Sequence, residues 1–144
     1  MYMSKATHKP TQQHLDDILK ISVDNNKQKN ITGMLLYVSE KNETQNGRFI
    51  QVLEGEEKVV RESFEKIRMD VRHTSVVELF TYSINDRNFP DWSMGYKRIE
   101  SEDLPADLKE WFDPDNFPNN KAKGIINVPL TYLKSFNQLY KQLK

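Results

Sequence analysis

The spacing of apolar residues along the chain predicts a protein of alternating strands and helices. Apolar side chains recur at helical spacing in two segments, residues 12–24 and residues 56–70. Short apolar or alternating runs bounded by polar residues predict strands over residues 1–4, 31–38, 49–53, 76–82 and 92–96. The resulting order, β-α-β-β-α-β-β, predicts an α+β fold in which both helices pack on one face of a mixed, mostly antiparallel sheet.

The amino-acid composition changes after Glu100, so we expect residues 1–100 to form one domain. Beyond this point prolines divide the chain into short pieces, and apolar residues at helical spacing predict a last helix over residues 130–143. The segment 101–144 is too short to build a core of its own. We therefore expect it to be a C-terminal helical extension that packs on the first domain.

Composition excludes several classes of function. The 144 residues include 21 lysines and arginines and 21 aspartates and glutamates, so the basic excess typical of nucleic-acid binders is missing. The absence of cysteine excludes disulfides, thiolate metal sites and cysteine nucleophiles. The histidines are too dispersed to suggest a zinc or iron site; they are His8, His14 and His73. Without a long apolar run or a signal-peptide pattern, we expect a cytoplasmic protein with no nucleic-acid or membrane partner.

Gln51 is a polar residue in the middle of a strongly apolar predicted strand. Side chains alternate along a strand, so Gln51 shares a face with Phe49 and Leu53. A carboxamide between two large apolar side chains is costly unless its donors and acceptor find partners. Gln51 therefore hydrogen-bonds either a nearby backbone group or a ligand, and the strand pattern leaves both interpretations open.

Two consecutive carboxamides, Asn25 and Asn26, end the first predicted helix. Their spacing from Ile18 and Leu15 places both on the apolar stripe of that helix. There they could hydrogen-bond a flat heterocycle with mixed donors and acceptors. They could equally cap the helix, because asparagine tolerates the left-handed conformation.

Two other pairs also have an ordinary structural explanation beside a functional one. Lys66 and Asp70 lie four residues apart beside the apolar stripe of the second helix, where they form either a surface ion pair or part of a binding site. Trp92 and Met94 share one face of the last predicted strand, where such an alternation is usually part of the core.

Four sequence motifs, taken together, resemble those of one known family. They are ITGMLLY at residues 31–37, FIQVLEG at 49–55, DVRH at 70–73 and FPDWSMG at 89–95. Their order and spacing over residues 2–96 are similar to those of the motifs in the BLUF family. Members of that family are flavin-based sensors of blue light. The combination of FIQVLEG with WSMG further along the chain is quite specific for that family.

The resemblance implies a ferredoxin-like sheet that holds a flavin between its two helices without a covalent bond. It implies FAD as the flavin, with FMN or riboflavin also possible, and a photoreceptor rather than an enzyme. Its signal would pass to a downstream protein or to another copy of the chain. The residues of the implied photoswitch are Tyr2, Gln51, Trp92 and Met94. The residues implied to contact the flavin are Ile18, Asn25, Asn26, Phe49, Gln51, Lys66, Ile67 and Asp70.

The chain departs from the family pattern at three places. Only Met1 precedes Tyr2, the loop at residues 39–47 is longer than the usual turn, and Lys66 stands where arginine is more common. The short first strand favours an alternative, a flavin-free regulatory or protein-interaction module on the same fold. A small ferredoxin-like enzyme such as an acyl-phosphate hydrolase is disfavoured, because the chain shows no glycine-rich phosphate loop with a paired arginine and asparagine.

Overall fold

Five strands form a mixed sheet at the centre of the computed structural model, which describes residues 1–42, 44–109 and 130–136. The strands are β1 (Tyr2–Ala6), β2 (Thr32–Ser39), β3 (Arg48–Glu54), β4 (His73–Glu78) and β5 (Gly95–Glu100). Their order across the sheet is β4-β1-β3-β2-β5. Strand β5 runs parallel to β2, and the other neighbours are antiparallel. The predicted α+β fold with a mostly antiparallel sheet is confirmed.

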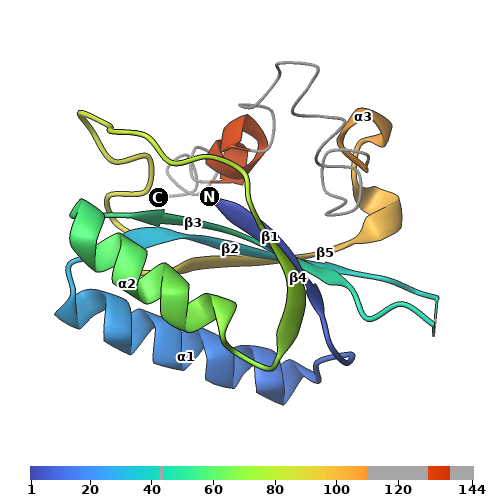
Figure 1. Ribbon diagram of the computed structural model, residues 1–144. Coiled ribbons are helices and arrows are strands. Elements are labelled where there is room, and N and C mark those ends of the chain that lie inside the picture. Colours follow the sequence, from blue (N-terminus) through green and yellow to red (C-terminus); the bar gives the residue numbers. More distant parts are fainter. Residues whose placement is uncertain (43, 110–129, 137–144) are drawn as a thin grey trace.

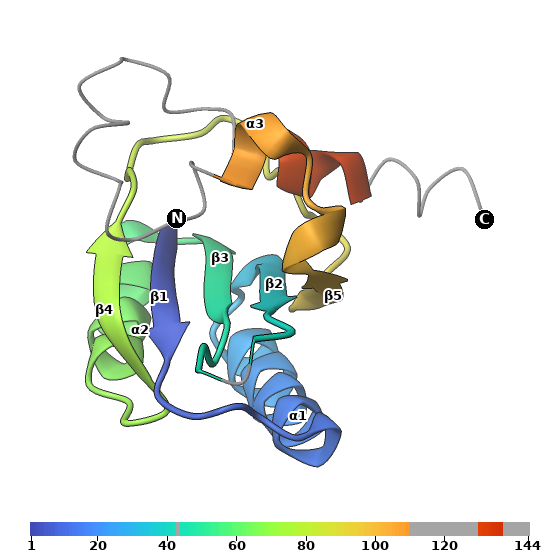
Figure 2. The same ribbon diagram turned by 90° about the vertical axis from the view of Figure 1, so that its right-hand side faces the viewer.

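Two helices, α1 (Gln12–Gln28) and α2 (Glu57–Arg68), cover one face of this sheet (Figure 1). Helix α1 begins after Thr11, whose side chain accepts a hydrogen bond from the His14 backbone N–H. The described segments after β5 lie on the opposite face (Figure 2); they are the 3-10 helix η1 (Ser101–Asp103), the short helix α3 (Ala106–Lys109) and the helical residues 130–136. Within the described residues, no helix is both long and apolar enough to cross a membrane.

Each face of the sheet carries its own apolar cluster. On the face away from α1 and α2, buried strand residues pack with Leu104, Leu108 and Leu133. On the helix face, Leu15 of α1 packs with buried strand residues such as Phe49. Among the described residues, this second cluster contains none from α2.

The strand predicted over residues 76–82 ends earlier than expected, at Glu78. Its neighbour β1 begins at Tyr2, which lies opposite Glu78, so the ladder between the two strands stops there. The residues that follow keep a strand-like sequence but have no strand to pair with in the described structure. The prediction correctly identified a local preference for extended structure. Without a neighbouring strand to pair with, these residues form no strand.

The strand predicted over residues 92–96 begins only at Gly95. The residues before it form a turn in which the Trp92 backbone N–H bonds the Phe89 carbonyl at 3.3 Å. The placement of Trp92 and Met94 on one face of a strand is therefore wrong, because both precede β5. The last predicted helix is observed at residues 130–136, and its remainder lies outside the described residues.

Candidate functional site

A tyrosine and a glutamine form a buried pair at the centre of the sheet. The antiparallel register of β1 and β3 places Tyr2 opposite Gln51. The Tyr2 hydroxyl donates a hydrogen bond to Gln51 Oε1 over 2.5 Å, and the two residues are only 4% and 5% exposed. Burial, reinforced by the nearby Asp70 carboxylate, raises the pKa of the Tyr2 phenol well above its ordinary value. Tyr2 is therefore a neutral donor throughout the physiological pH range.

The other side of the Gln51 carboxamide meets a sulfur atom. Gln51 Nε2 donates to Met94 Sδ over 3.3 Å, and a thioether is a weak acceptor. Within the described residues the second N–H of this amide has no further hydrogen-bond partner. A buried amide with unused donor capacity is costly unless another acceptor reaches it. The unused donor of Gln51 thus leaves room for one hydrogen-bond acceptor above the sheet.

A small cavity of about 200 Å³ opens on the same face of the sheet beside α1. Ile18 and Phe49, two of the residues expected to pack on a flavin ring, both line it. Its rim carries the polar side chains of His14 and Arg72. Ile67, the third residue expected to pack on the ring, is half-buried on α2 and does not line this cavity. The structure thus brings the α1 and β3 residues of the expected apolar site together.

The two asparagines at the end of α1 point in different directions. Asn26 is buried, and its Nδ2 donates to the Ser93 carbonyl over 2.8 Å. Asn25 is exposed, so the expectation that both side chains lie on the apolar stripe is wrong for Asn25. Consecutive helical residues are rotated by about 100°, which prevents both from facing the sheet. Asn26 therefore ties α1 to the residue directly before Met94.

Asp70 is bound by Arg72 rather than by Lys66. The Asp70 carboxylate accepts hydrogen bonds from the Arg72 backbone N–H and from Arg72 Nε, each over 2.9 Å, and also contacts Nη2. The side-chain hydrogen bonds from Arg72 hold the pKa of Asp70 below its usual range. Lys66 is exposed one turn earlier on α2. Sequence reasoning recorded Arg72 within the DVRH motif but gave it no role.

His73 belongs to the same cluster and was missed by the sequence analysis. Its ring stands edge-on to Tyr2, with centroids 6.2 Å apart and an interplanar angle of 74°. Its Nδ1 lies 2.8 Å from Ser4 Oγ, and its Nε2 hydrogen-bonds the Ile67 carbonyl. His73 thus joins the end of α2 to β1 beside Tyr2. The sequence signal for this role was the DVRH motif, of which His73 is the last residue. The wide spacing of the three histidines had been used only to argue against a metal site.

Met94 and Trp92 lie on opposite faces of the sheet. Met94 is buried in the helix-side cluster beside Gln51. Trp92 packs against the other cluster and stacks on Phe89, with ring centroids 6.0 Å apart. A Cβ built on Gly95 would lie 2.1 Å from the Trp92 ring, so only glycine allows this close approach. In this structure Met94, and not Trp92, is the neighbour of the glutamine.

The sheet topology and the two helices on one face define a ferredoxin-like α+β domain, and the comparison with family models names its family. The model for BLUF domains, described as sensors of blue-light using FAD, matches residues 1–95. The chain belongs to the BLUF family, whose members are flavin-binding sensors of blue light. The resemblance of the four sequence motifs is thereby confirmed.

Curated relatives share this region with the chain. The photoactivated adenylate cyclase subunit beta of Euglena longa is 37% identical over 94 residues, which is 65% of this chain and 10% of that protein. Subunit alpha of Euglena gracilis is 41% identical over 86 residues, 60% of this chain and 8% of that protein. The chain therefore spans about one tenth of the length of these relatives.

Solved structures agree in fold and sequence. The photo-activated state of BlsA superimposes with a TM-score of 0.61 at 34% identity, covering 81% of this chain and 78% of that one. The dark state of BlrB, a BLUF protein, gives a TM-score of 0.59 at 28% identity, covering 80% and 84%. A Klebsiella pneumoniae BlrP1 structure that holds FMN gives 0.59 at 28% identity, covering 74% and 26%. The ferredoxin-like fold is confirmed.

Proposed function

We propose that this chain is a blue-light receptor that binds FAD without a covalent bond and responds by rearranging the hydrogen bonds of Gln51. The observation that carries the proposal is the buried chain of contacts from the Tyr2 hydroxyl through the Gln51 carboxamide to Met94 Sδ. FMN and riboflavin share the ring that these groups would contact, so they are alternative occupants. The chain acts in this account as a sensor and not as an enzyme.

Residues from both helices and from β3 would hold the flavin ring. Ile18 and Phe49, which line one cavity, would pack on the ring from α1 and β3, and Ile67 would do so from α2. Gln51 would donate its unused N–H to an acceptor atom of the ring. The polar edge of the ring would be met by the amide and charged side chains at the ends of the two helices, namely Asn25, Asn26, Lys66 and Asp70.

When bound and excited by blue light, the flavin supplies a strong oxidant beside the sheet. Tyr2 would give an electron to the flavin and its phenol proton would follow through the Gln51 carboxamide, because the neutral phenol already donates to Gln51 Oε1. With the phenol proton gone, Gln51 Oε1 would lack its donor, and the carboxamide could turn or change tautomer, which exchanges the positions of its donors and acceptor. The electron and proton then return to Tyr2. The reversed amide would bond the ring carbonyl more strongly and shift the absorption to longer wavelength.

Met94 would transmit this change from Gln51 to the rest of the protein. Reversal of the amide removes the Nε2 donor from Met94 Sδ, so Met94 loses its polar partner. The neighbouring Ser93 carbonyl is held by Asn26, and Gly95 begins β5. An exchange between Met94 and Trp92 near the glutamine would alter β5 and the segments that follow it. From there the signal would pass to a partner protein or to a second copy of the chain.

Incubation of the purified protein with FAD, FMN or riboflavin, followed by removal of free flavin, tests the proposal. We expect yellow protein whose absorption band moves to longer wavelength under blue light and recovers in the dark. Protein that stays colourless with all three flavins would contradict it. That result would favour the flavin-free regulatory module, in which Asp70 stays bound to Arg72 and Asn25 stays exposed, as the structure has them.

A further inference from the structure

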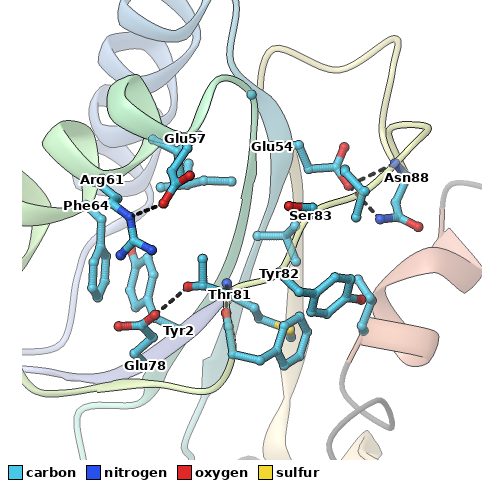
Figure 3. A pocket seen from close by; sticks show the side chains of 18 of the residues that line it. Tyr2, Glu54, Glu57, Arg61, Phe64, Glu78, Thr81, Tyr82, Ser83 and Asn88 are labelled. Atoms are coloured by element: carbon cyan, nitrogen blue, oxygen red, sulfur yellow. Dashed lines mark hydrogen bonds and ion pairs between the residues drawn. The ribbon is translucent and has the colours of Figure 1, made fainter.

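A buried carboxylate lies at the end of β3, three residues beyond Gln51. Glu54 is only 4% exposed, and its Oε1 accepts hydrogen bonds from the backbone N–H and from Nδ2 of Asn88, each over 2.8 Å. Both bonds can be followed in Figure 3, which shows a cavity of about 640 Å³ that these two residues help to line. The other oxygen, Oε2, accepts from the Phe89 backbone N–H over 3.0 Å and from Thr32 Oγ1 over 3.4 Å.

A carboxylate in this buried position is costly unless hydrogen bonds replace the water that it loses. Arg87 extends the network that meets this cost. Its Nη1 donates to Thr32 Oγ1 over 3.2 Å, and that hydroxyl donates to Glu54; its Nη2 donates to the Asn30 carbonyl over 2.8 Å. The network therefore joins the start of β2, the end of β3 and the residues that Glu54 binds. An apolar side chain would fill this position without the cost of desolvation, so the carboxylate is best explained by the segment that it holds.

Residues 88–94 form the segment that leads into β5, and it is held from β3, β2 and α1. Glu54 of β3 binds its first two residues. The Gly33 N–H of β2 donates to the Trp92 carbonyl over 3.0 Å. Asn26 of α1 donates to the next carbonyl of the segment over 2.8 Å. The segment is therefore fixed at both ends, and Glu54 is its anchor at the end away from β5.

Phe89 links the anchor at Glu54 to the far end of this segment. Its ring is completely buried and stacks on Trp92, and its carbonyl accepts a hydrogen bond from the Trp92 N–H over 3.3 Å. Two residues later, Met94 Sδ accepts from Gln51 Nε2. Because close packing and hydrogen bonds leave little freedom between these points, a displacement of Phe89 would displace Met94.

We propose that Glu54 is a positioning residue for the light response: its carboxylate fixes the segment 88–94 and so keeps Met94 against the Gln51 carboxamide. This role rests on the proposed function. For the amide to reverse its donors and acceptor, Met94 must move aside and later return. The firmness with which the segment is held therefore contributes to the barrier of both steps. A looser segment lowers that barrier, and the lit state then returns to the dark state faster.

The rate of dark recovery of flavin-loaded protein tests this role with two matched substitutions. Glu54→Gln keeps one oxygen for the Asn88 donors but places an NH2 group where Oε2 accepts from the Phe89 N–H. We expect the light-induced absorption shift to be kept and to decay about tenfold faster. The control is Glu40→Gln, which changes a half-buried carboxylate directly after β2 that accepts from Ser101 Oγ over 2.6 Å, and it should recover at the original rate. Equal recovery rates of the two variants would overturn the role of Glu54, while the proposed function would stand.

A milder substitution at the same anchor serves as the second test. Asn88→Ala removes the Nδ2 donor and leaves the carboxylate and its other hydrogen bonds in place, so we expect the fold to be kept. Recovery should be about threefold faster than in the original protein. An unchanged rate would contradict the anchoring of the segment by Glu54.

Nuclear magnetic resonance of the flavin-free chain tests the positioning itself, apart from any light response. In the original protein we expect a nuclear Overhauser effect between the Gln51 side-chain amide and the Met94 methyl group, because Nε2 lies 3.3 Å from Sδ. Glu54→Gln and Asn88→Ala should weaken it, whereas Glu40→Gln should not. An undiminished effect in the first two variants would overturn the positioning role. If the original protein binds no flavin, the proposed function fails, and this measurement still decides whether Glu54 positions Met94.

Discussion

At the scale of single residues, the buried carboxamide of Gln51 has one strong partner and one weak one. The strand period placed this side chain on the apolar face with Phe49, and the structure buries it there. Its pairing with Tyr2 could not come from periodicity, because the register between two strands depends on which turns and neighbours join them. Only the family resemblance indicated that partnership. The unused N–H of Gln51 and the contact of its Nε2 with Met94 Sδ could be found only from the structure.

Removal of the Tyr2 hydroxyl should cost stability as well as the light response. Tyr2→Phe leaves the buried Gln51 Oε1 without its donor, so we expect the free energy of unfolding to fall by about 1–3 kcal/mol. Urea denaturation measures this change, and the light response of flavin-loaded protein should disappear. The control is Tyr82→Phe, which removes a hydroxyl from a half-exposed ring and should change neither quantity. Equal effects of the two variants would contradict the account of Tyr2.

The ion pair between Asp70 and Arg72 should give the stability a defined dependence on pH. Arg72 holds the folded pKa of Asp70 below its ordinary value of 3.8. The stabilisation is therefore fully present above that ordinary value and is lost as the pH falls through the lower folded pKa. Asp70→Asn should lower stability at pH 7, and its difference from the original protein should shrink as the pH falls from about 5 to about 2.

The control for this titration is Asp24→Asn, an exposed aspartate of α1. Its stability difference from the original protein should stay small at every pH. A difference for Asp70→Asn that stays constant with pH would show that the carboxylate contributes no charge-dependent stability.

At the scale of elements, β2 and β3 were the most predictable part of the fold, with bounds within one residue of the predicted ones, and β4 and β5 were the least. Apolar stripes fixed both helices to within a few residues, because their packing face repeats over several turns. The start of β5 depends on a local contact, the approach of the Trp92 ring to Gly95, which no periodicity encodes. The orientation of Asn25 and Asn26 could not be predicted either, because it depends on how α1 is rotated about its axis.

Asn26 should therefore matter more to stability than its neighbour. Asn26→Ala removes the donor that satisfies the Ser93 carbonyl and loosens α1 from the turn before β5, so we expect a loss of about 1–3 kcal/mol. Asn25→Ala is the matched control, and as an exposed substitution it should change stability by no more than about 0.5 kcal/mol. Thermal and urea denaturation of the two variants measure the difference. A larger loss for Asn25→Ala would contradict the observed orientation of the helix.

At the scale of the whole molecule, the two faces of the sheet pack against different parts of the chain. The helix face holds the Tyr2–Gln51 pair, whereas the opposite face packs with segments that follow β5. Leu133 is fully buried in that second cluster. Of the C-terminal extension, the described residues 101–109 and 130–136 therefore pack on the sheet, and that it carries the output stays a proposal.

A cavity made at Leu133 should destabilise the domain as a whole. Leu133→Ala is expected to lower the free energy of unfolding by about 2–5 kcal/mol while a single cooperative transition is kept. Lys134→Ala, at the adjacent exposed position, should be close to neutral. Urea denaturation followed by circular dichroism measures both. A loss for Leu133→Ala no greater than that of Lys134→Ala would show that this segment folds apart from the sheet.

The central claim is that light acts by rearranging the hydrogen bonds of the Gln51 carboxamide. The most direct measurement is the light-minus-dark absorption spectrum of FAD-loaded protein, compared with those of Gln51→Leu and of Gln45→Leu, an exposed loop control. We predict that all three proteins bind flavin and that only Gln51→Leu lacks the shift to longer wavelength. A full shift in Gln51→Leu would contradict the account.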